Sequence, residues 1–171
     1  KVIEIDPGMA FGTGTHETTS LCLKMIEKYM KKGQTLLDVG CGSGILSIGA
    51  ALLGASKVLA VDIDPEAVKV SKENVALNGC SDEVEVRYGN LVEGIDFKAD
   101  VVAANLMADL VMILSSHVVD HMKKGGVYIS SGILTEKEEQ VAKAISDCGF
   151  RIIEIMEDGM WCAIAAALEE E

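Results

Sequence analysis

The segment at positions 38–44, Asp-Val-Gly-Cys-Gly-Ser-Gly, combines three closely spaced glycines with apolar residues on both sides. Glycines at such a turn let the backbone bend sharply and approach a bound molecule closely. A dinucleotide-binding turn has the spacing G-x-G-x-x-G, with its third glycine where this chain has Ile45. Dinucleotides present a pyrophosphate to the following helix, whereas S-adenosylmethionine (SAM) carries no phosphate. The spacing G-x-G-x-G therefore favours SAM over NAD or FAD.

Three polar residues follow the next three apolar runs, where each run ends. Asp62 can accept both hydrogens of a ribose diol; the alternative role, capping a helix, is already filled by Asp64. Asn90 offers a donor and an acceptor to the edge of an adenine, or forms only a local turn. Asn105 either begins a turn or holds an attacking amine in line with a sulfonium methyl group, which makes it the candidate catalytic residue.

The glycine- and threonine-rich loop at 6–19 leads directly into a helical pattern. Phe11 stands there among small residues and hydroxyls, which suits a lid over a polar ligand; a flexible arm is the alternative. Thr19 and the amides of the first helical turn can bind the carboxylate of a methionine moiety.

Hydrophobic periodicity alternates along the chain between strand-like and helix-like segments. Asp64 is expected to cap the helix that begins at Pro65, and Thr135 is expected to form a capping box with Glu138. The predicted helices cover 18–32, 45–53, 65–77, 109–122 and 135–148, and the predicted strands cover 35–39, 57–61, 84–88, 100–104, 127–131, 151–156 and 160–167. This alternation predicts an α/β fold in which helices cover both faces of a mostly parallel seven-stranded sheet that ends in an antiparallel hairpin.

Length and composition fit one SAM-binding catalytic domain over 1–171, because 171 residues with 49% hydrophobic content can build one core. The net charge of −12 opposes direct binding to nucleic acid and suits a basic protein partner. Five cysteines without metal-ligand spacing indicate a reduced, cytoplasmic protein with no bound metal. No uncharged apolar run reaches the ~18 residues of a membrane span, and we expect a monomer.

Four segments together resemble the ribosomal protein L11 methyltransferase family, a class I SAM-dependent family with a Rossmann-like fold. They are Phe-Gly-Thr-Gly-Thr-His at 11–16 with two following threonines, the glycine turn at 38–46, Asp-Ile-Asp-Pro at 62–65 and Asn-Leu-Met-Ala at 105–108. The resemblance covers essentially the whole chain, in order and spacing. It implies SAM contacts at Thr19, Gly40, Asp62 and Asn105. The cofactor-binding prediction is completed by Gly42 and Ile63, which lie in the same segments, and by Asn90.

The resemblance also implies an activity. The family transfers methyl groups from SAM to lysine side chains and to the N-terminal amine of a large-subunit ribosomal protein, releasing S-adenosylhomocysteine (SAH). Because the family has a substrate-recognition domain before its catalytic motifs, we expect the chain to correspond to the C-terminal catalytic domain only, without that N-terminal domain. The chain departs from the family where Asp109-Leu110 follows Ala108 in place of Gly-Pro-Leu, close to the expected substrate pocket.

Methyl transfer to nitrogen requires a neutral amine, whereas lysine and α-amino groups arrive mostly charged at neutral pH. We expect deprotonation before transfer, with Asn105 orienting the amine and alignment supplying most of the rate. Asp109 and Glu17 are candidate bases, although each suits a helix surface better. The alternatives are a methyltransferase acting on another protein or on a small-molecule amine, a non-catalytic SAM-binding module, and a nucleotide-dependent oxidoreductase.

Overall fold

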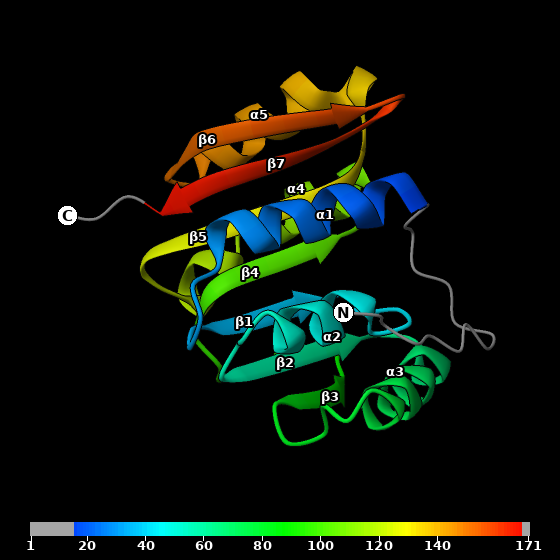
Figure 1. The fold of residues 1–171 in the computed structure, drawn as a ribbon. Helices are drawn as coiled ribbons and strands as arrows, with labels where there is room; N and C mark the ends of the chain where they lie inside the picture. Colours follow the sequence, from blue (N-terminus) through cyan, green and yellow to red (C-terminus); the bar gives the residue numbers. More distant parts are fainter. Residues whose placement is uncertain (1–15, 169–171) are drawn as a thin grey trace.

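A computed structural model describes residues 16–168 of the chain. Strands and helices alternate through most of its length, as the sequence predicts (Figure 1). The helices are α1 His16–Tyr29, α2 Ile45–Leu52, α3 Pro65–Leu77, α4 Ala108–Ser115 and α5 Glu138–Asp147, with short 3₁₀ helices η1 Val118–His121 and η2 Thr135–Lys137. The strands are β1 Thr35–Val39, β2 Lys57–Asp62, β3 Val84–Tyr88, β4 Ala99–Asn105, β5 Met122–Leu134, β6 Phe150–Asp158 and β7 Trp161–Leu168.

The seven strands form one sheet in the order β3-β2-β1-β4-β5-β7-β6. Neighbours from β3 to β5 pair in parallel, and β7 pairs antiparallel with both β5 and β6. The predicted mostly parallel sheet with a C-terminal hairpin is therefore confirmed. From β1 the strand order runs one way to β2 and β3, and then the chain crosses to β4 on the other side of β1. Ligands of such sheets bind at the carboxyl ends of the strands next to this switch point, which lies between β1 and β4.

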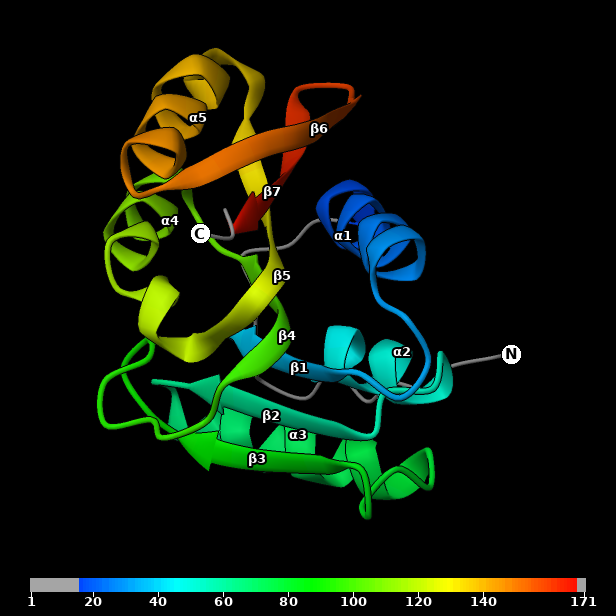
Figure 2. The ribbon, with the colours of Figure 1, turned by 90° about the vertical axis from the view of Figure 1, so that its left-hand side faces the viewer.

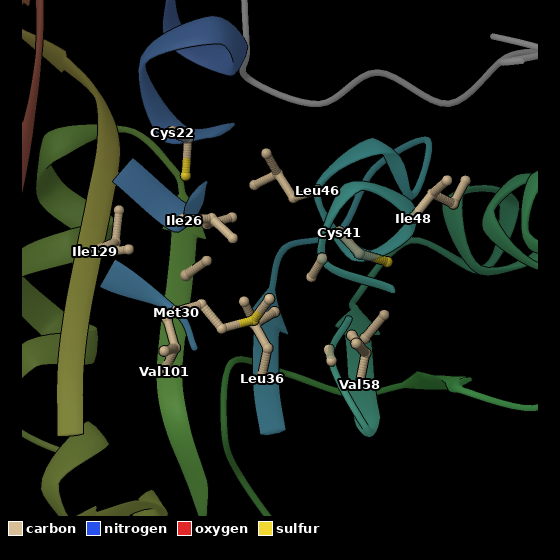
Figure 3. Packing of buried hydrophobic residues seen from close by; sticks show 14 of the residues in the cluster. Cys22, Ile26, Met30, Leu36, Cys41, Leu46, Ile48, Val58, Val101 and Ile129 are labelled. Carbon is tan, nitrogen blue, oxygen red and sulfur yellow. The ribbon is translucent and has the colours of Figure 1, made fainter. Parts of the chain in front are cut away.

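Helices cover both faces of the sheet, with α1 and α2 on one side and α4 and α5 on the other (Figure 2). Successive strand residues alternate between the faces: Leu36 belongs to the apolar cluster under α1 and α2, and Leu37 belongs to the opposite cluster. Figure 3 shows Cys22 and Ile26 of α1, and Met30 directly after this helix, directed toward the strands. These buried contacts fix both layers and therefore the loops at the strand ends.

Two predicted segments differ from the structure. The helix predicted over 109–122 ends at Ser115, and β5 begins at Met122 rather than at 127. The extension of β5 follows from its two partners, because β4 pairs with it from Met122 to Ser131 and β7 pairs with it from Val127 to Leu134. The hydrophobic pattern of one strand does not reveal which strands pair with it on its two sides.

The predicted capping box is wrong. Thr135 lies in η2, α5 begins only at Glu138, and neither element has a side-chain hydrogen bond at its N-cap. A hydrogen bond to the Glu157 carboxyl is the largest cause that raises the pKa of Glu138, and burial and the Glu157 charge add to the rise. The predicted cap at Asp64 is confirmed, because its side chain accepts a hydrogen bond from the Glu66 N–H at 2.9 Å.

Within residues 16–168, no helix combines the length and apolar character needed to cross a membrane.

Candidate active site

Three of the predicted site residues meet at the carboxyl edge of the sheet. Thr19 in the first turn of α1, Gly40 after β1 and Asn105 at the end of β4 line one small cavity of about 70 Å³. They come from three separate elements, which the parallel pairing of β1 with β4 and the packing of α1 on the sheet bring together. Asn105 is 8% exposed, so its amide is almost entirely enclosed.

Asp62 ends β2 beside this cavity, and its carboxylate is held by the backbone. One oxygen accepts the Gly42 N–H at 2.9 Å, and the other accepts the Asp64 N–H at 2.9 Å. These bonds tie the glycine turn to the end of β2 and orient the carboxylate. An ionised carboxylate has about four lone-pair positions, so each oxygen can accept a further hydrogen bond.

The glycine turn is also held by the buried face of α3, which sequence reasoning missed. Ser71 donates to the Gly42 carbonyl at 2.7 Å, and Asn74 donates to the Ser43 carbonyl at 2.8 Å. Both side chains are fully buried on a helix that is otherwise exposed along much of its length. Their spacing of three residues on one helix face was the available signal, because polar residues on the apolar face require buried partners.

Asp38 lies under the same turn and is fully buried. One of its oxygens accepts a 2.6 Å hydrogen bond from the Ser47 hydroxyl; among residues 16–168 the other, Oδ1, has no hydrogen-bond partner. The pKa of Asp38 is raised from its ordinary 3.8 to about 7. Burial is the largest cause of this rise; the hydrogen bond from Ser47 opposes it, and the nearby Asp62 charge adds to it. The turn thus stands over a carboxyl group that changes its charge near neutral pH.

Asn105 faces a bulge in β5. The pairing of β5 with β7 shifts register between Ser130 and Ile133, which leaves one extra residue on β5. Gly132, in this bulge, has a φ of +86°, and a Cβ built on it would lie 2.9 Å from Asn105 Oδ1 and 2.7 Å from the Leu106 carbonyl oxygen. Bulges of this kind occur beside active sites, where they redirect side chains. Only glycine, which has no Cβ, fits here without a clash.

The first turn of α1 is fastened to the same place. Ser131, which lies opposite Asn105 in the β4–β5 pairing, donates a hydrogen bond to the Thr18 carbonyl at 2.8 Å. Both residues are fully buried. The neighbouring Thr19 is therefore held close to Asn105 by a contact that no sequence pattern indicates.

The remaining predicted residues lie apart from this cavity. Ile63 is 56% exposed, and Asn90 lines a separate cavity of about 390 Å³ with residues of α4 and η1. Gly40 has a second reason to be glycine, since a Cβ there would lie 2.5 Å from a methyl group of Leu106. Residues 6–15 of the predicted loop, with Phe11, lie outside the described residues, and residues 16–19 form the first turn of α1 rather than a loop.

The family described as ribosomal protein L11 methyltransferase (PrmA) matches residues 1–169. The chain belongs to the ribosomal protein L11 methyltransferase family. A ribosomal protein L11 methyltransferase of Clostridium botulinum is 52% identical over 168 residues, and one of Alkaliphilus metalliredigens is 48% identical over 168 residues. These alignments cover 98% of the chain and 53% of each relative, so the chain spans about half the length of these L11 methyltransferases.

A solved structure described as ribosomal protein L11 methylase, from Lactobacillus delbrueckii subsp. bulgaricus, matches the fold with a TM-score of 0.94. The two chains are 36% identical, and the match covers 99% of this chain and 86% of that one. An RNA methyltransferase from Salinibacter ruber, solved with SAH, has a TM-score of 0.70 at 22% identity. The second likeness shows the shared methyltransferase fold alone, whereas the first extends over the same L11 methyltransferase domain.

Proposed function

We propose that the chain is the SAM-binding catalytic domain of a protein methyltransferase that modifies amino groups of ribosomal protein L11. The observation that supports this proposal most directly is that Thr19, Gly40 and Asn105 line the same cavity at the carboxyl edge of the sheet. Membership in the L11 methyltransferase family supports both the cofactor and the substrate. The proposal covers residues 1–171 as one domain.

The donors and acceptors of the site fit SAM. Asp62 presents two carboxylate oxygens that each accept one backbone N–H and keep further capacity for a ribose diol. Thr19, with the amides at the start of α1, suits the methionine carboxylate. The exposed side chain of Ile63 suits the adenine face. The amide of Asn90 has the donor and the acceptor that suit the adenine edge, although Asn90 lines a separate cavity in this structure. Gly40 and Gly42 give the backbone its close approach.

Bound there, SAM supplies an electrophilic methyl group. The residues of this chain contribute the position of the attacking amine: Asn105 offers an amide oxygen that accepts an N–H of the neutral amine and directs its lone pair. An enclosed, apolar surrounding disfavours an ammonium, which lowers the pKa of the incoming amine. Proximity and alignment then provide most of the acceleration.

The partner is a basic protein rather than a nucleic acid. A net charge of −12 attracts a positively charged ribosomal protein and repels phosphate. We further propose a cytoplasmic monomer. The five cysteines support a reducing compartment, since four of them are buried and none forms a disulfide.

The direct test is methyl transfer from isotopically labelled SAM to purified ribosomal protein L11, with the modified positions located by mass spectrometry. We expect label on amino groups, and we expect Asn105→Ala to lower kcat by roughly 100-fold or more while the Kd for SAM changes little. Equal losses in turnover and SAM affinity would contradict an orienting role for Asn105. SAM binding without transfer to L11 would leave only the cofactor part of the proposal standing.

A further inference from the structure

Asp38 is a fully buried acidic side chain to which the proposed function assigns no role. It is the last residue but one of β1, and it faces α1 and α2 together with Leu36, because strand residues two apart lie on the same side of a sheet. Ser47, in the first turn of α2, donates to one of its oxygens, and within residues 16–168 Oδ1 accepts no hydrogen bond. Buried polar atoms normally have such a partner, so Oδ1 needs an explanation.

No positive charge in the described part of the chain balances Asp38. None of the ion pairs formed within residues 16–168 includes it. The titratable groups around it are the thiols of Cys22 on α1 and Cys41 in the glycine turn, and the Asp62 carboxylate at the end of β2. Burial keeps both thiols neutral, because it raises the pKa of each far above its usual range. The charge that acts on Asp38 is therefore that of Asp62, which is also negative.

The electrostatic influence of Asp38 extends to the small cavity of the candidate active site. Cys41 lines that cavity, and the Asp38 charge adds to the rise in the pKa of its thiol, of which burial is the larger cause. Asp62 ends β2 beside the same cavity. Because Asp38 is buried, its charge is screened less than a charge in solvent. A cation bound in the cavity would thus be attracted by two acidic side chains.

Cofactor and product differ in charge at the sulfur atom. SAM has a positively charged sulfonium, whereas SAH has a neutral thioether, and the two molecules are otherwise alike apart from the methyl group. A buried carboxylate without a counter-ion is unfavourable. The sulfonium supplies that missing positive charge, and the thioether of SAH does not.

We propose that Asp38 is a specificity-determining residue that favours SAM over SAH, because its buried carboxylate is the counter-charge of the sulfonium. The inference rests on the proposed SAM-dependent function and adds how the site distinguishes cofactor from product. Asp38 acts through its charge and not by contact with the reacting atoms. Because burial is the main cause that raises the pKa of Asp38 to about 7, its carboxylate forms, and the preference for SAM grows, as the pH rises through neutrality.

Calorimetric titrations of the chain with SAM and with SAH, at about pH 5.5 and at about pH 7.5, test this proposal without catalysis. Two unit charges about 10 Å apart, at an effective dielectric constant of about 20, change a binding constant by roughly tenfold, which is a coupling of about one pKa unit. We therefore expect the ratio of the SAH Kd to the SAM Kd to rise about fivefold between the two pH values.

Two matched variants isolate the charge. Asp38→Asn removes the charge and keeps the shape of the side chain, so the ratio of the two Kd values should no longer depend on pH. Asp82→Asn makes the same chemical change at an exposed position and should keep the wild-type dependence. The comparison also cancels the titration of the ligands' own amino groups, which is the same for every variant.

Ser47→Ala provides a test that does not remove the carboxyl group. The Ser47 hydroxyl stabilises the ionised form of Asp38 and opposes the rise in its pKa. Without that hydrogen bond the pKa of Asp38 rises further, so the pH at which the preference for SAM develops should shift upward. A purely structural role for Asp38 does not predict this shift.

A wild-type ratio that does not change with pH, or a rise that persists unchanged in Asp38→Asn, would overturn the role of Asp38. If Asp38→Asn does not fold, the midpoint measured for Ser47→Ala decides, and an unshifted midpoint would count against the proposal. Failure of the proposed function has a different signature, because the wild-type chain would then bind neither SAM nor SAH at either pH.

Discussion

Gly132→Ala is the substitution that most directly perturbs the position of Asn105. The φ of +86° places alanine in the left-handed region, which costs about 1–2 kcal/mol for a residue with a Cβ. The new methyl group would lie 2.7 Å from the Leu106 carbonyl oxygen and 2.9 Å from Asn105 Oδ1. Crowding of this kind adds about 1–3 kcal/mol. Together these effects predict a loss of about 2–5 kcal/mol of unfolding free energy.

Gly149→Ala separates the two contributions. Gly149 has a φ of +96°, and a Cβ there would meet no atom within 4 Å. It therefore carries the backbone cost of about 1–2 kcal/mol without crowding. Urea denaturation of both variants at 25 °C measures the difference, which we expect to be about 1–3 kcal/mol. Equal destabilisation of the two variants would refute the close approach at Gly132.

The same pair of variants tests function. Because the alanine methyl at position 132 must displace the Asn105 amide or the backbone after it, we expect kcat for L11 methylation to fall at least about tenfold. The Kd for SAM should stay close to that of Gly149→Ala. A Gly132→Ala enzyme that is destabilised but retains full turnover would show that Asn105 need not be held in this position.

Three further predictions concern the buried polar groups around the site. Because the pKa of Asp38 is raised from 3.8 to about 7, the folded state favours the protonated carboxyl. This contribution to the unfolding free energy is fully present below about pH 4 and is lost as the pH rises through about 7. At about 1.4 kcal/mol per pKa unit the loss reaches at most about 4 kcal/mol, so urea denaturation between pH 4 and 9 should show a pH-dependent decline that Asp38→Asn reduces. Ser71→Ala, which removes the hydrogen bond to the Gly42 carbonyl, should lower unfolding free energy by about 1 kcal/mol and weaken SAM binding in calorimetry. Ser131→Ala, which removes the hydrogen bond to the Thr18 carbonyl, should lower the unfolding free energy by about 1–3 kcal/mol and raise hydrogen exchange in the first turn of α1.

The sheet was predictable because its parallel strands carry almost unbroken apolar runs. Val101 to Ala104 in β4 are all buried, and a segment of this kind suits a strand covered on both faces. The length of β5 was not predictable, because it depends on pairing with β4 over one half and with β7 over the other. The capping box failed for a related reason, since η2 delays the start of α5 until Glu138.

The candidate site was predictable where one strand end supplies one polar residue. Asp62 and Asn105 could be found in this way, because the carboxyl ends of parallel strands meet at one edge. Gly132 could not, since its importance arises from a bulge opposite Asn105 that only the sheet register reveals. The spacing of Ser71 and Asn74 on one face of α3 signals that both have buried partners, but the sequence does not identify those partners as carbonyls of the glycine turn.

The central claim is that Asp62 and the glycine turn form a SAM site, and calorimetric titration tests it most directly. Purified chain is titrated with SAM, with SAH and with NAD, alongside Asp62→Ala and the control Asp82→Ala at an exposed position before β3. We predict micromolar binding of SAM and SAH, no binding of NAD, loss of SAM binding by at least about 100-fold in Asp62→Ala, and wild-type binding in Asp82→Ala. Binding of NAD, or SAM affinity that is unchanged in Asp62→Ala, would contradict the account.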